Sequence, residues 1–243
     1  MDYEVQLEPA AERDQTQEAL VVAFADGRVE RMRLHEYSRV YAIPGLYEEV
    51  VQRRLECQSP RRLADLLVAC AGRAGTLPPD LRVLDVGAGN GVVGEELRAR
   101  GVEVLVATDN ISEARAAAVR DRPGLYADYL VGDVDDLPEL GPLIRERDLN
   151  SIVAAGALAF GHVSAASFAR LWEHFPPGAW FAVSLHEELA APGAGEFADY
   201  VDELERDGEL VLRERFRHRL TMDGTPIHYL AIVARRPAAL PAL

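Results

Sequence analysis

Short apolar runs alternate with amphipathic stretches along the second two-thirds of the chain. Five of these runs read as strands, at 81–87, 102–109, 128–134, 151–157 and 180–186. Helix-length segments between them begin near Gly91, Ser112, Glu139 and Ser164. Strands that are apolar on both faces and separated by helices indicate a parallel sheet covered on both sides.

The pattern changes after His186. A helix is predicted around 196–206, and two strands at 210–220 and 228–236 flank a turn at Asp223-Gly224. Strands joined by so short a turn must be antiparallel. The sequence therefore predicts an α/β fold: a Rossmann-like, seven-stranded, mostly parallel sheet with a C-terminal antiparallel hairpin and helices on both faces.

The N-terminal part has a different texture. The first eighteen or so residues show no periodicity and are expected to form a loose acidic arm. The stretch 19–34 predicts a hairpin around Asp26-Gly27. Helical segments follow, broken at Pro44-Gly45 and Ser59-Pro60, with Ser59 as the expected N-cap of the last of them.

Composition excludes several classes of protein. The net charge of −14 over 243 residues disfavours nucleic acid and anionic membranes as partners. No apolar leader or membrane-length run is present, so we expect a cytoplasmic protein. All 26 basic residues are arginine, which excludes a P-loop, a pyridoxal phosphate Schiff base and a kinase lysine. Cys57 and Cys70 are expected to be reduced and structural.

The stretch "RVLDVGAGNGVVGEEL" at 82–97 carries the clearest chemical signal. Gly87, Gly89 and Gly91 allow the backbone to turn sharply between a strand and a helix and to approach a ligand closely. Their GxGxG spacing differs from the GxGxxG of dinucleotide-binding proteins. Asp85 precedes them, and a carboxylate suits a cationic ligand better than a pyrophosphate.

Two more acidic residues end the next two strands. Asp109 is placed to accept hydrogen bonds from both hydroxyls of a ribose. Asp133 is a candidate partner for an adenine amino group, with Val134 packing on the ring. Acids at three successive strand ends predict a ribonucleoside site whose ligand carries positive charge, as S-adenosylmethionine does.

On these residues, 60–236 resembles a class I S-adenosylmethionine-dependent methyltransferase, whose signature turn DxGxGxG is matched by "VLDVGAGNG". Within that superfamily, "GNGVVGEELRARG" is similar to the small-molecule group that includes the Williams-Beuren-region methyltransferase-like proteins. The resemblance implies S-adenosyl-L-methionine as cofactor and S-adenosyl-L-homocysteine as product. No metal is expected, because His, Cys and carboxylates form no metal-ligand spacing such as HExxH. It places the cofactor contacts on Asp85, Gly87, Gly89, Gly91, Asp109, Asn110, Asp133, Val134, Ala155 and Gly156.

The resemblance also divides the chain. Residues 1–59 would form an arm, a hairpin and lid helices, 60–236 the methyltransferase domain, and 237–243 a tail. Tyr37, Tyr41 and Tyr47 of the lid are candidates for contact with substrate, or else for packing of the extension on the body.

The methyl acceptor is less clearly marked. His162 and His186 follow the fourth and fifth strands and are candidate general bases, although either can serve merely to fix a loop. The [DN]PP[YFW] motif of nucleobase and protein-amide methylation is missing, which argues against those two reactions and leaves the acceptor unnamed. The expected acceptor is an oxygen or nitrogen atom of a small molecule. Arginines in "RERFRHR" at 213–219 are expected to be solvated or paired.

Two other functions stay open at this stage. A nucleoside-binding protein or partner subunit without transferase activity would show the same cofactor residues. A dehydrogenase is disfavoured by the glycine spacing. No feature of the sequence sets the oligomeric state.

Overall fold

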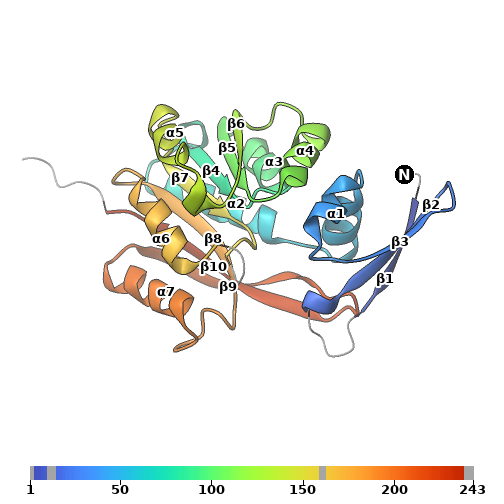
Figure 1. Ribbon diagram of the computed structural model, residues 1–243. Helices are drawn as coiled ribbons and strands as arrows, with labels where there is room; N and C mark the ends of the chain where they lie inside the picture. The colour runs from blue at the N-terminus through green and yellow to red at the C-terminus, as the bar shows by residue number, and fades with distance from the viewer. Residues whose placement is uncertain (1–2, 10–14, 159–162, 238–243) are drawn as a thin grey trace, which may run out of the picture.

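The structure, a computed structural model, describes residues 3–9, 15–158 and 163–237. Its main sheet has seven strands in the order β6-β5-β4-β7-β8-β10-β9 (Figure 1). The strands are β4 (Arg82–Val86), β5 (Val104–Asp109), β6 (Asp128–Val131), β7 (Ser151–Ala154), β8 (Trp180–His186), β9 (Leu210–Leu220) and β10 (Pro226–Arg235). Strands β4 to β8 pair in parallel and β10 pairs antiparallel with β8 and β9. The predicted fold class is confirmed.

Helices cover both faces of this sheet because its strands are apolar on both sides. One face packs on α2 (Ser59–Arg73) and α3 (Val92–Ala99). The other face packs on α5 (Leu140–Glu146), α6 (Ala165–Glu173) and α7 (Glu196–Arg206). Successive side chains of a strand point to opposite faces of the sheet. Val83 accordingly packs in the core under α2 and α3, and Leu84 in the core under α5, α6 and α7.

The chain runs outward through β4, β5 and β6 and then returns to β7 beside β4. After β4 the chain leads to a helix on one face of the sheet, and after β7 to a helix on the other face. This divergence leaves a crevice between the carboxyl ends of β4 and β7. This switch point lies at the glycine turn that follows β4. The fold thus sets the predicted ligand residues at the edge of a crevice.

The N-terminal part forms a second, smaller sheet of three antiparallel strands, in the order β1-β2-β3. These are β1 (Tyr3–Glu8), β2 (Ala19–Phe24) and β3 (Val29–Arg33), followed by α1 (Tyr37–Ala42) and a π-helix, η2 (Glu48–Arg54). Short 3-10 turns lie at Gln15–Gln17, Pro78–Asp80 and Val134–Asp136, the last labelled η4. Helix α4 (Ser112–Asp121) packs against α1 and joins the two parts (Figure 1).

Two local predictions are wrong. The first residues are not a loose arm throughout, because Tyr3, Val5 and Leu7 alternate with polar residues and form β1 against β2. Ser59 does not cap α2: the helix begins at Ser59, Gln58 holds the cap position, and the Ser59 hydroxyl contacts the imidazole of His218 instead. The predicted hairpin at 19–34 is confirmed as β2 and β3.

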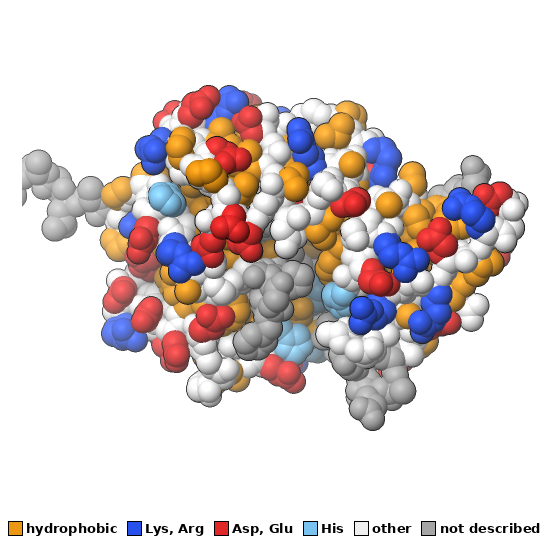
Figure 2. All heavy atoms as spheres, in the orientation of Figure 1, with side chains coloured by type: hydrophobic (Ala, Val, Ile, Leu, Met, Phe, Trp, Pro, Cys, Tyr) orange, Lys and Arg blue, Asp and Glu red, His pale blue; other side chains and the backbone are white. Residues whose placement is uncertain are grey.

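The surface carries mixed charge on the side seen in Figure 2. Acidic side chains gather over α7, whose sequence includes Glu196, Asp199 and Asp202. Acidic and basic side chains alternate over the N-terminal sheet and α1, so basic residues form no continuous patch on this side among the residues that are described. None of the helices described is both long and apolar enough to cross a membrane.

Candidate functional site

The turn after β4 adopts a conformation that only glycine reaches without strain. Gly87, Gly89 and Gly91 have φ of +67°, +55° and +93°, all in the left-handed region. A Cβ on Gly87 would stand 2.4 Å from the Cβ of Ala157. A Cβ on Gly89 would clash with the Tyr41 hydroxyl. The glycines therefore allow the backbone to turn and allow Ala157 and Tyr41 to pack closely against it.

Two tyrosines hold this turn from below. The Tyr126 hydroxyl donates to Asp85 Oδ2 at 2.6 Å, and the Tyr129 hydroxyl donates to the carbonyl of Gly89 at 2.7 Å. Asp85 is completely buried, and burial raises the pKa of its carboxyl to about 7, against the opposing effect of the Tyr126 hydrogen bond. Asp85 therefore lies beneath the turn and is not among the residues that line its cavities.

Asp109, the last residue of β5, is hydrogen-bonded to the turn that follows β4. Its Oδ2 accepts from the backbone N–H of Gly89 at 2.9 Å, and its Oδ1 accepts from the N–H of Ile111 at 3.0 Å. A carboxylate oxygen has two lone pairs, so each can accept a further hydrogen bond from a ligand. Asp109 is held at the cavity wall in a fixed orientation.

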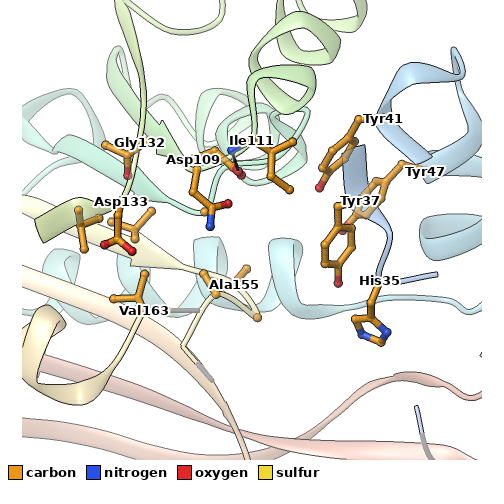
Figure 3. A pocket seen from close by; sticks show the side chains of 17 residues that line it. His35, Tyr37, Tyr41, Tyr47, Asp109, Ile111, Gly132, Asp133, Ala155 and Val163 are labelled. Atoms are coloured by element: carbon orange, nitrogen blue, oxygen red, sulfur yellow. Dashed lines mark hydrogen bonds between the residues drawn. The ribbon is translucent and has the colours of Figure 1, made fainter. Parts of the chain in front are cut away.

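A cavity of about 330 Å³ opens over these strand ends (Figure 3). Its size falls within the usual range of ligand sites, roughly 300–1,000 Å³. Most predicted cofactor residues lie in its wall, namely Gly87, Asp109, Asn110, Asp133, Val134, Ala155 and Gly156. Gly89 and Gly91 do not line it, because they lie within the turn.

Asp133 is the most exposed of these acids. It precedes η4, and its Oδ1 accepts from the N–H of Asp135 at 3.2 Å. In Figure 3 it lies on the same side of the cavity as Gly132 and Val163. Its second oxygen has no such contact with the backbone among the described residues.

Three tyrosines of the N-terminal part form the opposite wall (Figure 3). Tyr37 stacks on Tyr41 with ring centroids 5.9 Å apart, and Tyr41 meets Tyr47 at 5.1 Å. Burial raises the pKa of Tyr37 to about 12 and those of Tyr41 and Tyr47 well above their usual value. The wall is therefore uncharged and presents aromatic rings to the strand ends.

Ionic contacts fix this wall to the glycine turn. Arg122 donates to Glu48 Oε1 at 2.8 Å and to the carbonyl of Asn90 at 3.1 Å, and Asn90 also donates to Glu48. Arg120 donates to the carbonyl of Tyr41 at 3.1 Å. The N-terminal part is thus bound directly to the residues that shape the site.

A second cavity, of about 140 Å³, continues from the first. The two cavities share part of their lining, namely the three tyrosines, His35, Gly87, Ala155 and Gly156. The second cavity extends to Cys57 before α2, to Ser59 at the start of α2, and to His218 and Tyr229 of the terminal hairpin. Cys57 is a free thiol whose pKa burial raises to about 11.

The two histidines predicted as bases are placed differently from expectation. His186 ends β8, where its ring meets Tyr229 edge-on at 5.3 Å and its Nδ1 accepts from the N–H of Glu188 at 3.3 Å. It lines neither cavity. His162 lies outside the described residues.

Sequence reasoning missed His218, Tyr126 and Tyr129. Each comes from a segment distant in sequence from the glycine turn, and none belongs to a recognisable motif. The predicted pairing of the hairpin arginines is found: Arg215 pairs with Glu187 at 2.7 Å and Arg217 with Glu56 at 2.8 Å. Within the described ranges, no group of three or more His, Cys, Asp or Glu side chains is placed to hold a metal ion.

Comparison with known proteins finds similar structures but no similar sequence. No protein-family model matches the chain. No curated protein resembles it in sequence. A magnesium protoporphyrin IX methyltransferase from Synechocystis PCC 6803, solved with bound S-adenosylmethionine, is 14% identical, with 72% of this chain and 79% of that chain covered and a TM-score of 0.51.

Two further structures are similar. A structure from work on the conversion of a disulfide bond into a thioacetal group in echinomycin biosynthesis is 18% identical, covering 71% of this chain and 82% of that chain with a TM-score of 0.50. A TehB-like methyltransferase from Corynebacterium glutamicum is 22% identical, covering 73% and 87%, with a TM-score of 0.46. At these identities the likeness concerns the fold alone, a mostly parallel sheet with helices on both faces.

Proposed function

We propose that this chain is an S-adenosylmethionine-dependent methyltransferase acting on an oxygen or nitrogen atom of a small molecule. One observation carries the proposal. The glycine turn, Asp109 and Asp133 follow three adjacent strands and meet around one cavity of about 330 Å³. The methyltransferase fold supports this assignment but does not by itself establish an activity.

The cavity residues fit the donor in three places. Asp109 is oriented to accept from two ribose hydroxyls while keeping its own backbone contacts. Asp133 and Val134 offer an acceptor and an apolar surface for adenine. The rings of Tyr37, Tyr41 and Tyr47 face the strand ends, where a positively charged sulfur gains from aromatic faces.

S-adenosylmethionine supplies a methyl carbon that is already activated by its sulfonium. The chain itself would bind both reactants, align them and exclude water. Alignment and a dry site lower much of the activation barrier for an in-line displacement. The tyrosine wall serves the last purpose because Tyr41 and Tyr47 are held over the turn by neighbouring rings and by Arg120.

Calorimetric titration with S-adenosylhomocysteine tests the donor site. We expect a dissociation constant in the micromolar range, weakened about 10- to 100-fold by Asp109→Asn through loss of charge-assisted hydrogen bonds. Asp136→Asn is the matched control, because Asp136 is exposed and lines neither cavity. Failure of the unaltered protein to bind either S-adenosylmethionine or S-adenosylhomocysteine would refute the proposal.

A binding protein without transferase activity is the second candidate. It is favoured by one observation: His186, the one base predicted from the sequence that lies within the described residues, lines neither cavity. Transfer of label from methyl-labelled S-adenosylmethionine to members of a metabolite panel separates the two functions. A protein that binds the donor tightly and labels none of them would support the second.

A further inference from the structure

The second cavity meets the first at the glycine turn, and its far end is built by different parts of the chain. Ser59 and Pro60 come from the start of α2, Cys57 from the segment before it, and His218 and Tyr229 from β9 and β10. The strand-end acids Asp109 and Asp133 do not reach it. If the donor occupies the first cavity, as proposed above, the second lies beyond it and is free for another molecule.

A β-bulge places His218 at this cavity. The register of the terminal hairpin pairs Arg217 with His228 and Arg219 with Ile227, so His218 is an extra residue with no partner across the ladder. Such bulges redirect a side chain and are frequent beside active sites. The bulge is held in place because the carbonyl of His218 accepts from the N–H of Gln58 at 2.7 Å.

The ring of His218 is fixed as firmly as its backbone. It stacks on Tyr229 with centroids 4.0 Å apart and an interplanar angle of 21°. Its Nδ1 is 2.6 Å from the Ser59 hydroxyl. Nε2 is consequently the ring nitrogen left for a ligand, and among the described residues it has no hydrogen-bond partner. Burial lowers the pKa of His218 to about 3, so the imidazole is neutral at physiological pH.

The lining of the second cavity is almost free of charge. Arg219 is the only Asp, Glu, Lys or Arg side chain among its described residues. Arg219 is already paired with Glu18 at 2.7 Å, and both are nearly inaccessible to solvent. A ligand that brought a charge here would lose its hydration without gaining a free counter-charge.

From these features we infer that the second cavity is the acceptor subsite, and that it takes a small, uncharged, hydroxyl-bearing molecule hydrogen-bonded to His218 Nε2. Tyr37, Tyr47 and Tyr229 supply aromatic surface for its carbon skeleton. The proton on Nε2 depends on Ser59: when Ser59 donates to Nδ1, Nε2 donates to the ligand, and otherwise it accepts. A hydroxyl group satisfies either arrangement, whereas a carboxylate or an ammonium satisfies only one.

Three probes with one carbon skeleton test this inference: benzyl alcohol, benzoate and benzylamine. Their binding is measured by saturation-transfer NMR, with and without saturating S-adenosylhomocysteine. We expect benzyl alcohol to bind in both conditions and the two charged probes to bind at least about tenfold more weakly. The calorimetric binding of S-adenosylhomocysteine is followed in parallel, so a failure of the donor site is recognised separately.

Substitution of His218 locates the probe. His218→Phe keeps a ring against Tyr229 but removes both nitrogens, and should weaken benzyl alcohol about tenfold, as expected for one buried hydrogen bond, while S-adenosylhomocysteine binds within about twofold of normal. His174→Phe, at the end of α6 and outside both cavities, is the control.

Several results would overturn the inference while leaving the donor site intact. These are equal binding of the three probes, no binding of benzyl alcohol, an unchanged affinity in His218→Phe, or displacement of benzyl alcohol by S-adenosylhomocysteine. Displacement would mean that the donor itself fills the second cavity. The charge preference is measured on the unaltered protein and so holds even if a variant does not fold.

Discussion

Two carboxyl groups are buried in the described parts of the molecule, one beneath each half of the site. Asp85 lies under the glycine turn with the Tyr126 hydroxyl as its side-chain partner at 2.6 Å. Glu18 lies beside the second cavity, where its oxygens accept from Arg219 at 2.7 Å and from the N–H of Met222 at 2.6 Å. One carboxyl is stabilised by a neutral donor and the other by a full positive charge.

This difference separates the two halves of the site. Burial raises the pKa of Asp85, so its neutral form is favoured and the turn holds a group close to titration. Glu18 instead forms an ion pair that links the residue before β2 to the end of β9. The glycine turn is therefore organised by local contacts, while the far end of the second cavity depends on a charged contact between segments about 200 residues apart.

The largest effect is expected from breaking the buried ion pair. Glu18→Gln leaves the charge of Arg219 uncompensated, and we expect the free energy of unfolding to fall by about 3–5 kcal/mol. Equilibrium denaturation in urea measures it. Glu49→Gln, which breaks contacts between exposed or half-buried groups, should cost less than about 1 kcal/mol and is the control.

A double variant then distinguishes charge from packing. Glu18→Leu with Arg219→Met replaces both charges by apolar groups, and should recover most of the loss because neither ion remains buried alone. If Glu18→Gln were no more harmful than the surface control, the buried pair would not be what joins the two parts of the chain.

A smaller, pH-dependent effect is expected at Asp85. Its pKa of about 7 in the folded state lies above its value in the unfolded chain, so the folded state binds the extra proton between about pH 4 and 7. Its contribution to stability is full below pH 4 and is lost as the pH rises to 7. We expect that loss to be on the order of 2–4 kcal/mol.

Asp85→Asn isolates this contribution. The difference in unfolding free energy between the unaltered protein and Asp85→Asn should fall with increasing pH across that window, whereas the difference for Asp136→Asn should stay flat. Denaturation curves at several pH values measure both. A difference that rises with pH would mean that Asp85 is stabilised as the carboxylate, contrary to the structure described here.

The sequence was sufficient for the main sheet and for the positions of the glycine turn and the acids at its edge. The period-2 and helical patterns predicted the strands β4 to β10, because each is a local pattern of four to eleven residues. The GxGxG turn and the acids after β5 and β6 could be recognised for the same reason, since parallel strands bring their carboxyl ends to one edge. The alternation of Tyr3, Val5 and Leu7 is also a local pattern of this kind, but it is short and lies among charged residues.

The far end of the second cavity could not be predicted in this way. His218 reaches the cavity through a single-residue bulge, whose position depends on pairing across the hairpin and on the contact with Gln58. Ser59 has the residue type of a helix cap and instead meets His218, because the hairpin approaches the start of α2. Arg219 looked like its three neighbours in "RERFRHR", yet it alone among them is buried. Such roles are set by tertiary contacts rather than by any local pattern.

A crystal structure with S-adenosylhomocysteine tests the central claim most directly. We predict the ribose hydroxyls on Asp109, the adenine beside Asp133 and Val134, and the sulfur facing the entrance to the second cavity, with His218 uncovered. Density for the ligand away from the strand ends, or no density at a saturating concentration, would contradict the account.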